Sequence, residues 1–366
     1  MVVTSHARPL APPPLFCPLP PVGTYHDTSG LDRRAVRWAD RWGLVDATER
    51  ERLGRIGIGL LTSLIMPHGL AAPTQLAADF SAWLFAFDDC HSDEGQRSSL
   101  ISQQAGLVCE LTRILECPEV KPDPRDVFTA ALRDLRVRLA SVATHAQVAR
   151  WVDAMRGYLA ATIWESANRA DSIIPSLNEY TAMRLHSGAL KPSIALLDVA
   201  DGYELPAPVL ARPDVRALIE MTCLLCGWDN DIISYAKEAH RVGDGQNLID
   251  VIVTQERCPP AQALESAVAM RDRVMCLFLS IRDQTLADAS PNLRRYVTSL
   301  GYWVRGNIEW GSQSARYRSL DGLSASPASG LATQPADSRL EPLPIPAIVW
   351  WWRTLRLGNP FSRGYS

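Results

Sequence analysis

Residues 230–238 read NDIISYAKE, a run without proline or glycine in which oxygen-bearing side chains recur every four positions. An α-helix turns about 100° and rises about 1.5 Å per residue, so Asn230, Ser234 and Glu238 line one stripe about 12 Å long. An amide, a hydroxyl and a carboxylate are hard oxygen ligands, which suit a Mg²⁺ ion that completes its shell with water and phosphate. The stripe predicts half of a metal and phosphate site, although a trio of this kind can also lie on a solvated helix face.

The overall composition is that of an ordinary globular protein. The chain has 366 residues, of which 47% are hydrophobic and 21% are charged, enough for one large domain or two average ones. The 37 basic and 40 acidic residues give a net charge of −3, which does not suggest a nucleic-acid-binding surface. The sequence contains no secretory signal and no apolar run of about 18 residues, so we expect a cytoplasmic protein without stable membrane insertion.

The cysteines are scattered along a chain that is large enough to fold without a disulfide framework. We therefore expect the eight thiols to be reduced and mostly buried. Cys223 and Cys226 form a CxxC pair inside an apolar helical run, but no second pair completes a zinc site, so structural zinc is not favoured.

The distribution of proline, serine and glycine divides the chain into three regions. Residues 1–30 are proline-rich and predict an irregular N-terminal arm. Residues 31–318 repeat apolar positions at helical spacing, with no internal repeat and no linker, so we predict a single all-α domain. Residues 319–366 form a tail rich in proline and serine. The predicted helices are 31–43, 46–65, 73–92, 96–116, 124–141, 145–170, 176–201, 207–240, 259–285 and 290–318.

The tail contains one apolar cluster, residues 345–352, which read IPAIVWWW. This cluster is too short to span a bilayer. It could pack back onto the helical body as a flap or form a poorly ordered end, and the sequence leaves both alternatives open.

A second set of candidate metal ligands ends an apolar helix. Residues 85–94 read FAFDDCHSDE, so four carboxylates fall at a helix C-terminus, where the macrodipole and like-charged neighbours disfavour them. Asp88, Asp89 and Asp93 can share a face and could together bind a divalent cation. His91 is not expected to be a ligand, because imidazole is a poor match for Mg²⁺. A solvated acidic helix end is the alternative.

Two further segments carry candidate phosphate-binding groups. Arg184 precedes the pair Ser187-Gly188, which would loosen a helix and let its backbone approach a ligand. Arg316 and Tyr317 are adjacent and can both donate hydrogen bonds to phosphate oxygens, the arginine as a bidentate fork. A surface role for Arg184 remains the plain alternative. Trp303 and Trp310, seven residues apart, would share one helical face near the second segment, and they can equally be ordinary core residues.

Together these elements resemble the bacterial class I terpene synthases, over roughly residues 15–318. The aspartate-rich motif of that family, DDxxx(D/E), is similar to residues 88–93, and its NDxxSxxKE motif is matched in full by residues 230–238. The diphosphate-sensing arginine of the family, with its linker and effector residues, is similar to Arg184, Ser187 and Gly188.

The C-terminal Arg-Tyr pair of the family is similar to Arg316-Tyr317, which lie in a matching GNxxW…SxRY frame. Arg295-Tyr296 lacks this frame. Position 92 is a serine, so the shorter DDxxD spacing does not fit. Either Asp93 or Glu94 could complete the first site, and the longer motif favours Asp93.

The resemblance implies an all-α bundle around a central apolar cavity, with the two metal motifs facing each other across its mouth. It implies three Mg²⁺ ions, with ligands drawn from Asp88, Asp89, Asp93, Asn230, Ser234 and Glu238. It implies hydrogen bonds to the substrate diphosphate from Arg184, Lys237, Arg316 and Tyr317. Aromatic faces such as Phe87 and Trp310 would then stabilise the carbocation, by about 0.5–2 kcal/mol each.

The expected function is therefore Mg²⁺-dependent cyclisation of an isoprenyl diphosphate, with farnesyl diphosphate as the expected substrate. Geranylgeranyl diphosphate is the alternative, because Ala86 and Gly227 could leave extra room, and geranyl diphosphate is third. A chain-elongating prenyl diphosphate synthase would carry a second aspartate-rich motif where this chain has residues 230–238. A non-catalytic isoprenoid-binding protein is the alternative of another class. A homodimer is common in the resembling family.

Overall fold

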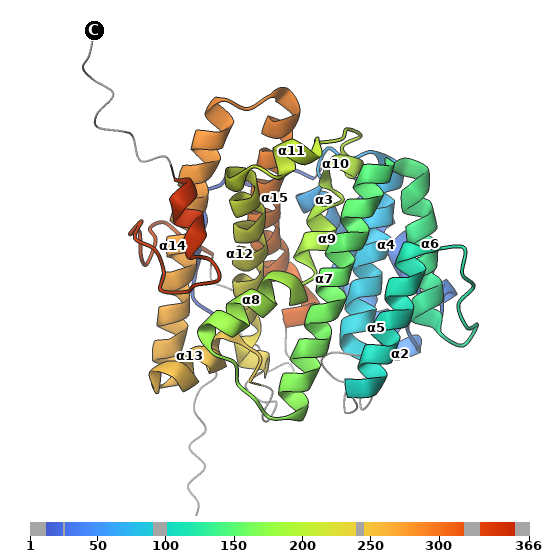
Figure 1. Cartoon of the computed structure of the whole chain (residues 1–366), viewed down its shortest axis with the longest axis horizontal. Helices are drawn as coiled ribbons and strands as arrows, with labels where there is room; N and C mark the ends of the chain where they lie inside the picture. Colours follow the sequence, from blue (N-terminus) through green and yellow to red (C-terminus); the bar gives the residue numbers. More distant parts are fainter. Residues whose placement is uncertain (1–11, 25, 91–100, 239–244, 318–329, 356–366) are drawn as a thin grey trace, which may run out of the picture.

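The computed structural model describes residues 12–24, 26–90, 101–238, 245–317 and 330–355, with the backbone alone for residues 236–238. The regular structure in these residues is almost entirely helical, so the predicted all-α fold is confirmed (Figure 1). The α-helices are α1 (Thr28–Arg41), α2 (Ala47–Ile56), α3 (Ile58–Ile65), α4 (Ala71–Asp88), α5 (Ile101–Glu116), α6 (Val127–Val142), α7 (His145–Ala170), α8 (Leu177–Ser187), α9 (Leu190–Ile194), α10 (Leu197–Ala200), α11 (Ala207–Leu210), α12 (Pro213–Glu238), α13 (Leu248–Glu256), α14 (Pro260–Ala287) and α15 (Pro291–Gln313). The other elements are strands β1 (Leu15–Phe16) and β2 (Leu331–Ala332) and the 3₁₀-helices η3 (Ala315–Tyr317) and η4 (Val349–Thr354).

Local sequence signals explain where several helices start. Thr144 and Gln147 form a capping box at the start of α7, and Ser176 and Glu179 form another at the start of α8. In each box a side-chain oxygen accepts from a backbone N–H that the first helical turn leaves unsatisfied, which contributes about 0.5–2 kcal/mol. The position of α8, which carries Arg184, is thus fixed from its first residue.

The structure divides several helices that the sequence predicts as continuous, among them 207–240, which is interrupted at residues 211–212 between α11 and α12. Gly57 adopts a left-handed conformation, with φ of +78°, and separates α2 from α3 within the predicted helix 46–65. The predicted helix 176–201 is broken after Ser187, where Ala189 adopts φ of +54°, and continues as α9 and α10. A left-handed residue cannot continue a right-handed helix, so each of these residues starts a new axis.

Helix α12 lies in the middle of the bundle, in contact with α8, α9, α14 and α15 (Figure 1). Its apolar side chains are buried around the whole circumference, as expected for a helix surrounded by other helices. Asp229 and Arg271 form an ion pair of 2.7 Å between α12 and α14, and both side chains are fully buried. Removing one partner of such a pair costs about 3–5 kcal/mol, so it sets the position of α12 against α14.

The N-terminal arm and the C-terminal tail meet on the surface of the bundle. β1 and β2 pair in parallel, with Leu15 opposite Leu331. The apolar cluster at residues 345–352 packs back onto the body, and Trp351 is fully buried. Of the two alternatives for the tail, the described part is therefore a packed segment.

Cys17, Cys223 and Cys226 are buried, whereas the other cysteines are partly or wholly exposed, so the prediction of mostly buried thiols was wrong. None of the helices in the described ranges combines the length and apolar character that a membrane span requires.

Candidate active site

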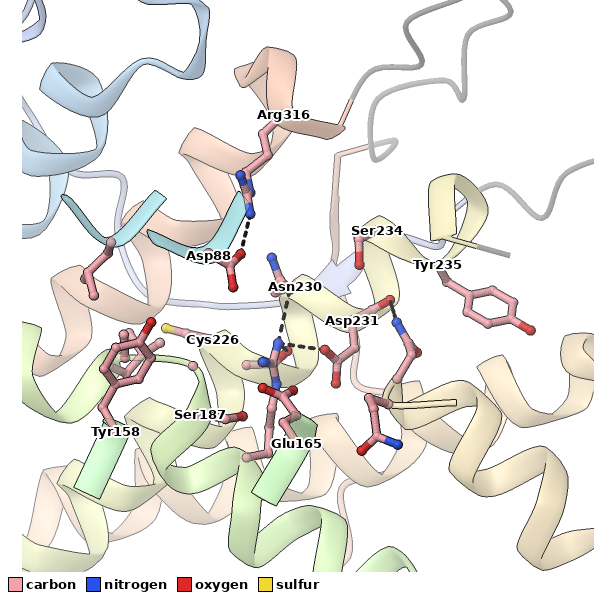
Figure 2. A pocket seen from close by; sticks show the side chains of 18 of the residues that line it. Asp88, Tyr158, Glu165, Ser187, Cys226, Asn230, Asp231, Ser234, Tyr235 and Arg316 are labelled. Carbon is pink, nitrogen blue, oxygen red and sulfur yellow. Dashed lines mark hydrogen bonds and ion pairs between the residues drawn. The ribbon is translucent and has the colours of Figure 1, made fainter. Parts of the chain in front are cut away.

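A cavity of about 590 Å³ opens between the helices and brings together candidate residues from distant parts of the chain. Its volume falls in the range of about 300–1,000 Å³ that is usual for small-molecule sites. Aliphatic and aromatic side chains form much of its inner wall, namely Leu61, Leu84, Phe85, Tyr158, Leu190, Trp303 and Trp310. Polar groups from α4, α12 and η3 converge above this wall (Figure 2).

The two predicted metal motifs face each other across this cavity. Asp88 ends α4 on one side, and Asn230 and Ser234 project from α12 on the other, and all three line the cavity (Figure 2). Residues 88 and 230 are far apart in sequence, so only the tertiary fold can place them at one opening. Asp93 and Glu94 lie outside the described residues, as do the side chains of Lys237 and Glu238.

Arg316 joins the aspartate-rich helix end to the C-terminal Arg-Tyr pair. Its Nη2 donates to Asp88 Oδ2 at 2.8 Å, and its Nη1 donates to Asp89 Oδ1 at 3.1 Å. The guanidinium carbon also lies 4.9 Å from the centre of the Phe85 ring, which is within cation–π range. The planar fork of arginine suits two carboxylates or a phosphate, so the same group can bind either.

Arg184 crosses from α8 to α12. Its Nη2 donates to Asp231 Oδ1 at 2.7 Å, to Asn230 Oδ1 at 3.0 Å and to the Gly227 carbonyl at 3.1 Å. Gly227 is what permits this approach, because a Cβ there would lie 3.2 Å from Arg184 Nε. Arg184 is therefore not a surface charge, and its guanidinium lies at the wall of the cavity.

Two tyrosines complete this polar network. Tyr180 donates through its hydroxyl to Asp231, and burial, followed by the charge of Asp231, raises the pKa of Tyr180 well above its usual value. Tyr180 therefore remains a protonated donor that holds the carboxylate beside Arg184. On the other side of the network, Asn230 Nδ2 donates to the Tyr317 hydroxyl at 2.6 Å.

Two serine hydroxyl groups at the cavity lack hydrogen-bond partners in the described structure, and a ligand could supply them. Ser234 Oγ and Ser187 Oγ are buried and have no hydrogen-bond partner within the described residues, although both residues line the cavity. A buried hydroxyl without a partner costs about 1–3 kcal/mol, and such groups call for an explanation. Ser234 stands one helical turn from Asn230 and across the cavity from Asp88, so its lone pairs fit a hard divalent cation. Ser187 fits a ligand that accepts a hydrogen bond.

One predicted site residue does not reach the cavity. Phe87 is fully buried behind the wall, where its ring stacks on Trp83 at 4.7 Å and meets Phe128 at 5.7 Å. Its expected role in facing the carbocation was wrong, because Phe87 precedes Asp88 by one residue and so points about 100° away from it around the helix. Phe85, three residues before Asp88, shares the helical face of Asp88 and lines the cavity.

The other predicted residues whose side chains the structure describes lie at the cavity or beside it. Ser187, Gly188 and Trp310 line it, and Trp310 is fixed by a hydrogen bond of 2.8 Å from Nε1 to the Ile56 carbonyl. Asp89 lies just behind Asp88 and contributes through Arg316. Sequence reasoning missed Tyr158 and Glu165, which α7 places on the wall. No local motif marks them, and only their helical spacing could have suggested a shared face.

The reason for expecting extra room near Ala86 and Gly227 does not hold. Arg184 fills the space beside Gly227, as its contacts with the missing Cβ position show. Ala86 is buried between helices and is not among the residues that line the cavity.

Comparison with known proteins agrees with this arrangement of fold and site. Residues 79–276 match the family described as terpene synthase family 2, C-terminal metal binding. The chain is 38% identical to a (+)-(1(10)E,4E,6S,7R)-germacradien-6-ol synthase of Streptomyces pratensis, over 97% of this chain and 100% of the relative. It is 35% identical to a (+)-T-muurolol synthase of Streptomyces clavuligerus, over 92% of this chain and 81% of that relative. Among solved structures it is similar to the SVS_A2 protein from ancestral sequence reconstruction, with a TM-score of 0.83, 32% identity, and coverage of 93% of this chain and 98% of that one.

The helical bundle and the family match define a metal-dependent class of lyases that act on diphosphate substrates. The chain belongs to the terpene synthase family, as a lyase that takes a divalent metal cofactor.

Proposed function

We propose that this enzyme cyclises farnesyl diphosphate in a Mg²⁺-dependent reaction that releases diphosphate. The observation that carries the proposal is the convergence of Asp88, Asn230 and Arg184 on one cavity that is also lined by aliphatic and aromatic side chains. A cavity that combines polar groups with apolar and aromatic side chains is complementary to a substrate with a charged head and a hydrocarbon chain. The name of the T-muurolol relative states that it cyclises (2E,6E)-farnesyl diphosphate, which supports this chain length.

The metal site would be divided between α4 and α12. Asp88 would be a ligand on one side and Asn230 and Ser234 on the other, with Asp89, Asp93 and Glu238 as the further candidates. Three Mg²⁺ ions are proposed from the resemblance. When bound, Mg²⁺ would neutralise charge that develops on the departing diphosphate. Oxygen ligands of this kind, with space for waters and phosphate, are the usual environment for Mg²⁺ in proteins.

The cationic residues would bind and orient the diphosphate. Arg184 pairs with Asp231, and Arg316 pairs with Asp88 and Asp89. A diphosphate could replace these carboxylates as the partner of each guanidinium, and a metal cation could replace the guanidinium as the partner of Asp88. Tyr317 lies against Asn230 and can donate its hydroxyl proton to a phosphate oxygen. Lys237 is a further proposed donor. Donors placed in advance around the leaving group stabilise its charge without a large reorganisation.

The apolar wall would control the carbocation after ionisation. Phe85 and Trp310 face the cavity with ring centres 5.9 Å apart, and Tyr158 adds a third aromatic side chain from α7. An aromatic face attracts a cation by about 0.5–2 kcal/mol. These rings would also exclude water, which would otherwise quench the cation as an alcohol.

The experiment is incubation of the purified protein with Mg²⁺ and, separately, with geranyl, farnesyl and geranylgeranyl diphosphate, followed by mass spectrometry of the organic extract. We expect a cyclic product from farnesyl diphosphate and none when the metal is chelated. Asp88→Ala and Asn230→Ala should each abolish turnover while the helical circular dichroism stays unchanged. Full activity in both variants would contradict the site, and cyclisation of geranylgeranyl diphosphate alone would contradict the substrate.

A further inference from the structure

The C-terminal segment of residues 343–354 packs across α8, which carries Arg184, and α12, which carries Asn230 and Ser234. Leu343, Ile345 and Ile348 are buried, and η4 contacts α12. The backbone N–H of Ala347 donates to Asn178 Oδ1 at 2.8 Å, near the start of α8. The segment is therefore attached to both α8 and α12, although none of its residues lines the cavity.

A chain of polar contacts runs from this segment to the helix break beside the active site. Trp351 Nε1 donates to Glu220 Oε2 at 2.9 Å, and Glu220 Oε1 lies 3.9 Å from Lys191 Nζ. Lys191 Nζ is in turn 3.3 Å from His186 Nε2. Because lysine has no acceptor, the ammonium is the donor and the imidazole accepts. Burial and the charge of Lys191 lower the pKa of His186 to about 4, so the imidazole is neutral near pH 7 and can accept this bond.

This chain of contacts spans the residues that break α8. His186 and Lys191 lie on either side of Ser187, Gly188 and Ala189, where the backbone turns through a left-handed residue. On its far side His186 rests on α7 so closely that a Cβ on Gly157 would come within 2.6 Å of Nδ1. Residues 187–189 are therefore restrained on one side by the packing of His186 against α7. On the other side they are restrained by the contacts that link Lys191 through Glu220 to Trp351.

The side chains involved are well protected from solvent. The Glu220 and Lys191 side chains are 17% and 21% exposed, and Trp351 is fully buried. A partly buried carboxylate that accepts from an indole N–H and faces an ammonium is restricted to one position. Loss of the indole donor would free Glu220 and Lys191 and loosen the turn that presents Ser187 and Arg184 to the cavity.

We propose that the C-terminal segment positions the diphosphate-binding end of α8, with Trp351, Glu220 and Lys191 as the positioning residues. The inference rests on the proposed function, because it concerns diphosphate binding by Arg184 and Ser187. It gives the tryptophan-rich tail a defined role in ligand affinity from outside the cavity.

The test is the affinity of the full chain for inorganic pyrophosphate in the presence of Mg²⁺, measured by calorimetry. Trp351→Phe keeps an aromatic ring in the buried site but removes the N–H donor, and we expect about two- to tenfold weaker binding. Trp352→Phe is the matched control, because the Trp352 indole lies next in sequence, is also buried, and has no hydrogen-bond partner in the described structure. It should bind pyrophosphate as the wild type does.

A second variant separates positioning from general loss of stability. Glu220→Gln removes the charge that faces Lys191, and it should weaken binding to a similar extent as Trp351→Phe. The double variant should be little weaker than either single variant, because both changes break the same chain of contacts. If Trp351→Phe does not fold, Glu220→Gln carries the test alone.

The outcomes distinguish this inference from the proposed function. A wild-type protein that does not bind pyrophosphate with Mg²⁺ would contradict the proposed function, and this inference with it. Wild-type binding that Trp351→Phe and Glu220→Gln leave unchanged would overturn the positioning role alone. Equal weakening in Trp351→Phe and Trp352→Phe, at equal melting temperature, would also overturn it.

Discussion

Arg316 Nη2 lies 2.8 Å from Asp88 Oδ2, so a diphosphate-binding candidate near the end of the helical body is bound to the first metal-binding candidate in the sequence. The contact joins η3 to the end of α4 and brings together residues 228 positions apart in the chain. In this arrangement Arg316 is hydrogen-bonded to the Asp88 carboxylate, which is the group that a metal cation would bind. We therefore propose that metal binding at Asp88 releases Arg316 toward a phosphate.

This relationship predicts a selective loss on substitution of Arg316. Arg316→Lys keeps the positive charge but removes the planar fork, so we expect kcat/KM to fall about 10- to 100-fold, the effect of losing one charged hydrogen bond. Arg295→Lys is the matched control, because Arg295 also precedes a tyrosine but stacks on Tyr203, outside the cavity. Steady-state kinetics of both variants check this, and equal losses would contradict the role of Arg316.

Substitution of Ser234 should lower activity without lowering stability. Its hydroxyl is buried without a partner in the described structure, so Ser234→Ala should leave the melting temperature of the metal-free protein unchanged or slightly higher. Metal-dependent turnover should fall at least tenfold. Ser166 Oγ is also buried without a partner but lies outside the cavity, so Ser166→Ala should change neither quantity. A large loss of stability in metal-free Ser234→Ala would mean that the hydroxyl has a structural role instead.

Gly227 should be intolerant of a side chain because Arg184 lies against it. Gly227→Ala places a Cβ 3.2 Å from Arg184 Nε, so we expect the guanidinium to shift and pyrophosphate affinity to fall several-fold. The control is Gly106→Ala, in the exposed part of α5, where no atom lies within 4 Å of the added Cβ. That change should stabilise the protein by up to about 1 kcal/mol. Unchanged affinity in Gly227→Ala would show that Arg184 does not need this contact.

Substitution of Phe85 should alter the products, whereas substitution of Phe87 should lower stability. Phe85→Leu removes an aromatic face from the cavity, so we expect an altered product mixture with little change in melting temperature. Phe87→Leu removes a ring from the stack on Trp83, so we expect a loss of about 1–3 kcal/mol in unfolding free energy and an unchanged product mixture. Product analysis by gas chromatography and thermal melts give both readouts, and the reverse pattern would contradict the assignment.

The sequence predicted the helical class and the convergence of the motifs better than it predicted side-chain direction. Residues 230–238 form the end of one helix as expected, because nothing in the run interrupts helical geometry. The error at Phe87 arose because the aspartate-rich motif does not show which neighbouring aromatic shares its face. Counting about 100° per residue from Asp88 would have selected Phe85.

Other differences depend on tertiary contacts that a local pattern does not show. Helix α13 was not predicted, because its sequence LIDVIVTQE is short and rich in β-branched residues, which favour strands in isolation. Its burial against α12 and α14 outweighs that preference. The tail gave no signal for packing either, since the partner of Trp351 is Glu220, 131 residues earlier.

The central claim is that the ends of α4 and α12 bind one metal-diphosphate ligand between them. A crystal structure of the protein grown with Mg²⁺ and inorganic pyrophosphate tests it most directly. We expect metal density in contact with Asp88 on one side and with Asn230 and Ser234 on the other, and the diphosphate within hydrogen-bonding distance of Arg184, Arg316 and Tyr317. Pyrophosphate bound elsewhere, with the Arg316–Asp88 contact intact and no metal at either helix, would contradict the account.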